Sequence, residues 1–212
     1  REQGPPATAP TVKATETKAL AAATEPAVIQ KPQPVSPQEA HRPGRLPDRV
    51  ILTWQGDPAR TQSVTWRTDT SVSLAKAQLA RADGGPGFSR TAIDVPATTT
   101  LLATDLNTAH FHSAQFVDLA PATRYAYRVG DGVNWSEWFQ FRTASTTAEP
   151  FSFVYFGDAQ NDLRSMWSRV IREAWSDAPK ASFMLHAGDL INRAESDADW
   201  GEWFQAGGWL NG

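Results

Sequence analysis

Two Gly-Asp dipeptides, Gly157-Asp158 and Gly188-Asp189, each follow a short run of aromatic and aliphatic residues directly. If both runs are strands of one parallel sheet, the aspartates stand side by side at its carboxyl edge, because neighbouring strands lie ~4.8 Å apart. Two carboxylates that close repel each other unless a proton or a cation lies between them. Two metal ions ~3.5–4 Å apart, bridged by one carboxylate, would remove the repulsion. The spacing therefore indicates a metal site, with glycines that let the backbone turn each carboxylate toward the cations.

The same dipeptides are also compatible with an ordinary structural role. Asp158 and Asp189 would then be turn residues or helix caps, which are common positions for aspartate. One Gly-Asp dipeptide after a strand is weak evidence for metal binding, and two in one strand–helix–strand unit are stronger evidence. Spacing alone leaves both interpretations open.

The residues around the dipeptides predict a βαβ unit. Phe151–Phe156 is a continuous apolar and aromatic run, typical of a strand buried on both faces, and Ala181–Ala187 is a second such run. Asn161 or Asp162 can cap a helix between them. That helix carries a wide apolar stripe: Leu163, Met166, Trp167, Val170, Ile171, Ala174 and Trp175. Two strands joined by one helix are expected to be parallel.

A second helix is predicted to begin near Ser196. Ser196 and Asp199 have the spacing of a weak capping pair. The apolar side of this helix would consist of Trp200, Trp203 and Phe204.

Before these elements, the apolar period changes to two, which predicts strands. Ser63–Arg67, Arg124–Val129 and Phe139–Arg142 alternate clearly, and Arg49–Trp54, Ala75–Arg81 and Phe111–Val117 do so more weakly. About six or seven short strands in about a hundred residues indicate a β-sandwich. The pattern Leu119-x-Pro121-x-Thr123-x-Tyr125 resembles the tyrosine corner of fibronectin type III domains, although a hairpin in another all-β fold would also fit it.

The first 47 residues differ from the rest of the chain. Residues 1–48 contain 9 of the 15 prolines and no Phe, Trp or Tyr, so they cannot bury enough apolar surface to offset the entropy of ordering them. The expected organisation is a disordered leader over 1–47, a sandwich over 48–145 and an α/β part over 151–212.

Bulk composition excludes several classes of function. The net charge is -3, and without a basic run an obligate nucleic-acid partner is not expected. No stretch approaches the ~20 apolar residues of a membrane span. There are no cysteines, which excludes disulfides and thiolate metal ligands.

Two sets of motifs resemble known families. Phe153–Asp158 and Phe183–Leu190 are similar to the first two motifs of the calcineurin-like metallophosphoesterases. Arg49–Pro58 and Val64–Thr68 resemble the N-terminal domain of purple acid phosphatases, as does Tyr125-x-Tyr127-x-Val129-Gly130-Asp131. The resemblance implies a fibronectin type III-like sandwich followed by the first βαβ-α portion of an α/β metallophosphoesterase domain.

The resemblance also implies an activity, the hydrolysis of phosphate esters, most simply monoesters, by two metal ions. Asp158 would bind the first ion and Asp189 would bridge both; iron, zinc and manganese, divalent or mixed-valence, are the candidate ions. The family's second motif carries a tyrosine three residues after the bridging aspartate, where this chain has Asn192. Asn192 would offer a neutral oxygen or orient a water, and Arg193 would meet the phosphate group.

The family's later motifs supply an Asn-His pair and further histidines. None of the four histidines here, His41, His110, His112 and His186, lies in such a motif. His41 falls in the leader, and His186 is expected to be a buried, hydrogen-bonded side chain. We therefore expect the remaining ligands and the leaving-group acid beyond Gly212, in a longer enzyme, with little turnover from this chain alone.

A different class of function competes with this hypothesis. The sandwich would then act as an extracytoplasmic binding or adhesion module, and the phosphoesterase portion would be inactive. An extracytoplasmic location is expected from the resemblance and from the leader's composition, although no signal peptide is visible. Oligomeric state is left open.

Overall fold

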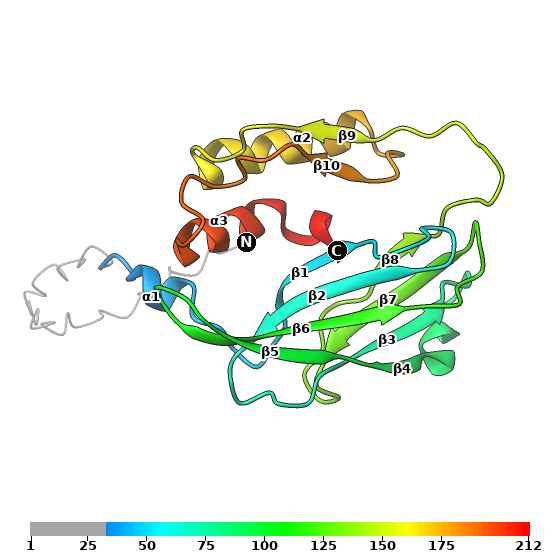
Figure 1. The fold of residues 1–212 in the computed structure, drawn as a ribbon, viewed down its shortest axis with the longest axis horizontal. Helices are drawn as coiled ribbons and strands as arrows, with labels where there is room; N and C mark the ends of the chain where they lie inside the picture. The colour runs from blue at the N-terminus through cyan, green and yellow to red at the C-terminus, as the bar shows by residue number, and fades with distance from the viewer. Residues whose placement is uncertain (1–32) are drawn as a thin grey trace, which may run out of the picture. The chain divides into compact units, whose positions relative to one another are not determined.

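The computed structural model describes residues 33–212, in which two four-stranded antiparallel sheets form a β-sandwich (Figure 1). One sheet has the order β1-β2-β6-β5 and the other β4-β3-β7-β8. Their bounds are β1 Asp48–Thr53, β2 Gln62–Thr68, β3 Lys76–Arg81, β4 Ile93–Pro96, β5 Thr98–Ala103, β6 Thr108–Phe116, β7 Arg124–Gly130 and β8 Phe139–Arg142. The predicted sandwich is confirmed, with eight strands instead of six or seven.

The two strands that the sequence did not reveal, β4 and β5, are edge strands. Every residue of β5 is exposed, and β4 has only one half-buried residue. A strand that buries neither face needs no alternation of polar and apolar residues, so it leaves no period-two pattern.

Alternation in the central strands forms the sandwich core. Val64 and Trp66 of β2 face Tyr127 and Val129 of β7 in one apolar cluster. The hydroxyl of Tyr125 accepts a hydrogen bond from the backbone N–H of Ala120 at 2.9 Å. The back-bonding expected of a tyrosine corner is therefore present.

The predicted disordered leader requires a correction at its end, while residues 1–32 lie outside the described residues. Pro37–Ala40 form the short helix α1, and the Ser36 hydroxyl accepts a hydrogen bond from the Glu39 N–H. Gln38 donates to the carbonyl of Leu106, and His41 is only 6% exposed. The composition argument counted apolar surface alone, whereas polar and backbone contacts hold this segment against the sandwich.

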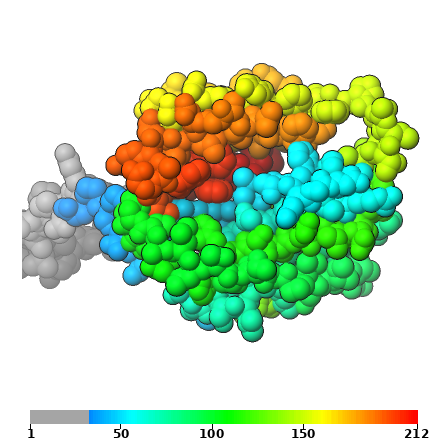
Figure 2. All heavy atoms as spheres, in the orientation of Figure 1, coloured from blue at the N-terminus to red at the C-terminus, as the bar shows by residue number. Residues whose placement is uncertain are grey.

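The predicted βαβ unit is present after the connector of residues 144–150, which partly stands clear of the strands in Figure 2. Strands β9 (Val154–Phe156) and β10 (Met184–His186) are parallel neighbours. Between them lie a π-helical turn, η2 (Leu163–Trp167), and helix α2 (Ser168–Asp177).

Two expectations about burial in this unit are wrong in part. Phe156 is buried, but Phe151, Phe153 and Tyr155 are exposed, so this run is buried on one face only. The helical stripe is also narrower than predicted: Leu163, Trp167 and Ile171 are buried, whereas Met166, Val170 and Trp175 are about half exposed. Sequence period marks which residues share a face, but not whether a neighbour covers that face.

Helix α3 (Asp197–Gly207) and the 3-10 turn η3 (Gly208–Asn211) lie between the sandwich and the βαβ unit (Figure 1). The predicted start of α3 is confirmed, because the Ser196 hydroxyl accepts a hydrogen bond from the Asp199 N–H at 3.2 Å. Trp203 is buried against Phe156 and Trp167, and Ile51 of β1 packs against the same cluster. The sandwich and the α/β part thus belong to one unit, Val35–Gly212.

A buried ion network joins α3 to the sandwich. Asp197 pairs with Arg49 at 2.6 Å and with Arg67 at 3.4 Å, and all three side chains are at most 6% exposed. Arg67 also forks onto Asp48, with hydrogen bonds of 2.9 and 2.7 Å. Arg49 has a positive φ of 50° at an irregularity in β1. Arg49 shares a strand face with Ile51, which packs against the cluster that contains Trp203 of α3.

The buried ring of His112 predicts that the stability of the sandwich depends on pH. Its ring lies between the hydroxyls of Thr68 (2.7 Å) and Thr99 (2.9 Å), and burial, assisted by His110, lowers its pKa to about 4. Because the folded pKa lies below the unfolded value of about 6.5, stability should fall as pH drops from 6.5 toward 4, by roughly 3 kcal/mol.

Denaturant unfolding at several pH values would measure that loss, with His112→Gln as the comparison. The amide keeps groups that can bond both threonines and does not titrate, so the variant should lose much of this pH dependence. A wild-type imidazole that protonates near pH 6.5 by NMR would contradict the prediction.

Candidate functional site

The two Gly-Asp dipeptides meet at one edge of the β9–β10 pair. Phe156 and His186 are register partners in the parallel ladder, and the Ala187 N–H donates to the Phe156 carbonyl at 2.8 Å. Asp158 therefore follows the end of one strand and Asp189 follows the end of its neighbour. Both residues are exposed, so their carboxylates are accessible to solvent ions.

The backbone turns sharply at both aspartates. Asp158 has φ of 50° and Asp189 has φ of 48°, which are left-handed conformations. Gly188 also has a positive φ, of 99°, but Gly157 does not. The expectation that both glycines make the turn is thus right only for Gly188, and the aspartates carry the left-handed conformation themselves. Such a conformation costs an L-residue roughly 1–2 kcal/mol, although aspartate tolerates it better than most residues.

Asn192 links the two loops that leave the strands. Its side-chain nitrogen donates to the carbonyl of Gln160 at 3.1 Å and to the side-chain oxygen of Asn161 at 3.0 Å. The nitrogen is therefore engaged by the loop after β9, and the oxygen is the atom through which Asn192 could meet a ligand or a water. The prediction that Asn192 contributes to a metal site stays a prediction.

Arg193 is directed toward the beginning of α3. Its guanidinium donates to the Ser196 hydroxyl at 3.3 Å and lies 3.7 Å from the Asp199 carboxylate. Its side chain remains 67% exposed, so the ion pair with Asp199 is screened by water and weak. Its predicted contact with phosphate is not tested by this arrangement.

The four histidines have different surroundings in the structure. His186 packs against the rings of Phe156, Trp167 and Trp203, and burial lowers its pKa. No hydrogen bond holds its ring within residues 33–212, so the expected hydrogen-bonded histidine is instead an aromatic-packed one. His41 and His112 are buried, and the His110 ring bonds the Val72 carbonyl at 2.8 Å.

Within the part of the chain that the structure describes, no group of three or more His, Cys, Asp and Glu side chains is arranged to hold a metal ion. Asp158 and Asp189 are oxygen donors at neighbouring strand ends, which fits part of a site for a hard cation. A complete site needs further ligands. In the same residues, no helix is long and apolar enough to cross a membrane.

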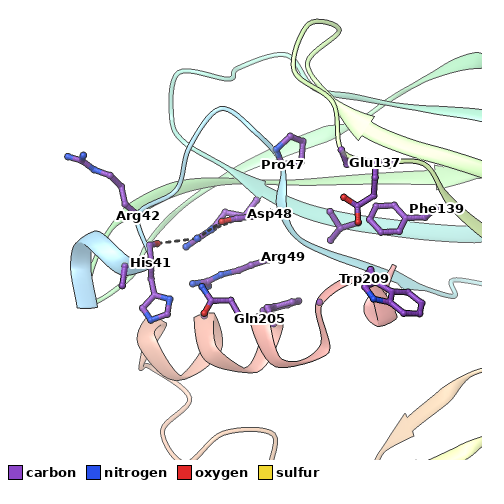
Figure 3. A pocket seen from close by; sticks show the side chains of 16 residues that line it. His41, Arg42, Pro47, Asp48, Arg49, Glu137, Phe139, Gln205 and Trp209 are labelled. Carbon is purple, nitrogen blue, oxygen red and sulfur yellow. Dashed lines mark hydrogen bonds and ion pairs between the residues drawn. The ribbon is translucent and has the colours of Figure 1, made fainter. Parts of the chain in front are cut away.

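Two pockets open elsewhere in the described residues, and neither is lined by Asp158 or Asp189. One, of about 320 Å³, lies between α1, the start of β1 and α3, where His41, Asp48, Arg49, Gln205 and Trp209 line it (Figure 3). The other, of about 460 Å³, lies between α2, β8 and the strands β9 and β10. The buried arginines beside the first pocket, Arg49 and Arg67, are paired with Asp197 and Asp48.

Sequence reasoning missed the functional potential of Arg49, Arg67 and Asp197. The sequence placed Arg49 and Arg67 in alternating strand runs, and Asp197 lies beside the predicted cap Ser196 without a signal of its own. The two arginines are separated from Asp197 by more than a hundred residues, and no local pattern connects them. An arginine on the same outer face of each of two adjacent strands is a signal only once the pairing of the strands is known.

Comparison with known proteins finds a family that is similar to the sandwich. Residues 47–143 match the family described as Purple acid Phosphatase, N-terminal domain. A search of curated proteins found no match. Among solved structures, PhoD is similar, with a TM-score of 0.48 and 13% identity over 76% of this chain and 35% of PhoD.

Two further solved structures are similar to parts of the chain. A computationally redesigned β-sandwich protein has a TM-score of 0.31 and 21% identity, over 48% of this chain and 96% of its own. Astrotactin-2, a perforin-like membrane protein, has a TM-score of 0.35 and 15% identity, over 63% of this chain and 26% of its own. This chain thus spans about a third of PhoD and a quarter of Astrotactin-2. Scores at this level do not establish a shared fold.

The link made by Asn192 predicts how firmly the two loops are held. Asn192→Ala removes both hydrogen bonds to the loop after β9, so the segment around Arg193 should open more often. Tryptic cleavage after Arg193, followed by mass spectrometry, should become several-fold faster than in the wild type. Asn134→Ala is the matched control, because the Asn134 side-chain amide bonds Asp131 within the turn between β7 and β8. Equal cleavage rates in wild type and Asn192→Ala would show that the link does not hold the loop.

Proposed function

We propose, from the match of residues 47–143 to the purple acid phosphatase N-terminal domain family, that the chain is part of a metal-dependent hydrolase of phosphate esters. The observation that carries the proposal is that Asp158 and Asp189 lie in the turns that follow two adjacent parallel strands, which end at Phe156 and His186. Ligands of open α/β sheets bind beyond the carboxyl ends of the strands, where these two carboxylates lie.

The local backbone supports a functional role for both aspartates. Both are held in left-handed conformations, and residues in such sparsely populated conformations cluster at binding and active sites. Both are exposed and have no ion-pair partner within residues 33–212, so no guanidinium or ammonium in that range occupies their oxygens. If the two aspartates were only turn residues or helix caps, they would not need to follow adjacent strands, and their side chains would not need to be exposed.

In the proposed site, Asp158 would hold the first metal ion and Asp189 would contact both. When bound, the two ions would lower the pKa of a water molecule and polarise the phosphoryl group. The aspartates act as ligands and not as general bases. Arg193, released from its weak contact with Asp199, has a guanidinium that matches phosphate oxygens bidentately, and Asn192 orients the loop through Gln160 and Asn161. Monoesters are the proposed substrates, and iron, zinc or manganese the proposed ions.

One observation favours a second candidate function. The family match lies wholly within the sandwich, and the α/β residues 151–212 are outside it. The sandwich would then be an extracytoplasmic binding or adhesion module beside an inactive α/β portion. The extracytoplasmic location itself is a proposal, supported by the resemblance and by the composition of residues 1–47.

Metal binding separates these candidates. Mn²⁺ added to the chain should bind weakly in the wild type, and Asp189→Ala should weaken binding at least about tenfold, since it removes the shared ligand. Electron paramagnetic resonance of free Mn²⁺ measures the affinity. Asp83→Ala, which removes an exposed carboxylate from a sandwich turn, is the matched control and should bind as the wild type does.

Activity supplies the second measurement. The full-length protein that contains this sequence should hydrolyse p-nitrophenyl phosphate. It should lose this activity with a chelator or with Asp189→Ala. Residues 1–212 alone should show little turnover. Robust metal-dependent turnover from them would refute the proposal that a complete metal site needs ligands outside these residues. Unchanged Mn²⁺ affinity in Asp189→Ala would instead refute the role of that aspartate.

A further inference from the structure

The segment between Asp189 and α3 is held at both of its ends. Residues 190–196 connect the second carboxylate to Asp197, the first residue of α3. Near the carboxylate, Asn192 is bonded to the loop after β9, and Ile191 is buried in the apolar cluster under α2. At the other end, Asp197 is fixed to the sandwich. A short segment anchored at both ends has few conformations available to it.

The anchor at Asp197 uses both its side chain and its backbone. Arg49 donates to the carboxylate at 2.6 Å and to the Asp197 carbonyl at 3.2 Å. Arg67 donates to the other carboxylate oxygen at 3.4 Å. The Asp197 N–H donates to the side chain of Asp105, between β5 and β6, at 2.8 Å. Three separate parts of the sandwich therefore hold one helical residue.

Arg67 is itself held in place. Its guanidinium forks onto the Asp48 carboxylate and also donates to the His41 carbonyl at 3.1 Å, where the chain leaves α1. Its side chain is 3% exposed, so it has little freedom to turn away. Asp48 and Asp197 balance the charges of the two arginines, and the network is rigid as well as neutral.

From this geometry we propose that Arg49 and Arg67 are positioning residues for the Asp158 and Asp189 site. They fix Asp197, which fixes the segment 190–196, and Asn192 transmits that position to the loop 158–162. This inference rests on the proposed function of the two carboxylates. It assigns the sandwich a definite task, which is to set the distance between two loops of the α/β part.

The test compares amide hydrogen exchange and Mn²⁺ affinity in the 212-residue chain. Arg49→Met keeps the apolar stem and removes the fork onto Asp197. We expect the amides of 158–162 and 190–196 to exchange at least about tenfold faster, with Mn²⁺ affinity lowered by a similar factor. Amides in β6 and β7 should keep their wild-type protection. Arg81→Met, on an exposed arginine of β3, is the matched control and should change neither measurement.

Asp105→Ala keeps the inference testable if Arg49→Met does not fold. It removes one hydrogen bond to Asp197 and leaves no buried charge unpaired, so the same amides should exchange about threefold faster. Unchanged exchange in both loops would overturn the inference, and so would an equal loss of protection in β6 and β7, which would indicate general destabilisation. Failure of the proposed function would appear differently, as a wild-type chain that does not bind Mn²⁺.

Discussion

The carboxylate of Asp197, held between Arg49 and Arg67, is the contact on which the arrangement of the chain depends. Removing two guanidinium groups and a carboxylate from water costs several kcal/mol for each ion, and only good geometry returns it. Here each carboxylate oxygen of Asp197 faces one arginine, and Asp48 satisfies the rest of Arg67. A displaced α3 would leave buried charges unpaired, so the network penalises other placements more than it stabilises this one.

Several local features serve that contact. The irregularity in β1 places Asp48 opposite Arg67, and Arg49, two residues before Ile51, lies on the side of the strand that α3 covers. The segment around α1 then closes over the same region through His41, whose ring packs against Gly201 of α3, where any larger residue would collide with it. Burial beside Arg49 lowers the pKa of His41, which keeps a further positive charge out of the network.

The candidate site follows a different physical rule. Asp158 and Asp189 are exposed, strained and unpaired within the described residues, while the charges at the sandwich boundary are buried and fully paired. A structural ion network needs complete pairing, whereas a binding site must keep donor atoms free for its ligand. The contrast within one molecule supports the assignment of a binding role to the aspartates and of a positioning role to the arginines.

The sequence by itself determined the central strands, the start of α3 and the positions of the two candidate aspartates. Period-two alternation marked the central strands, and the Ser196 cap marked the start of α3. The two Gly-Asp dipeptides marked the ends of two strands that prove to be adjacent. All of these features depend on neighbours within a few residues. Only the tertiary structure decided that the edge strands β4 and β5 exist, that Phe153 and Tyr155 lie on an uncovered face, and that His41 is buried. It also decided that Arg49 and Arg67 meet Asp197. Burial and ion pairing depend on which distant segments come together, and no local pattern in a single sequence records that distance.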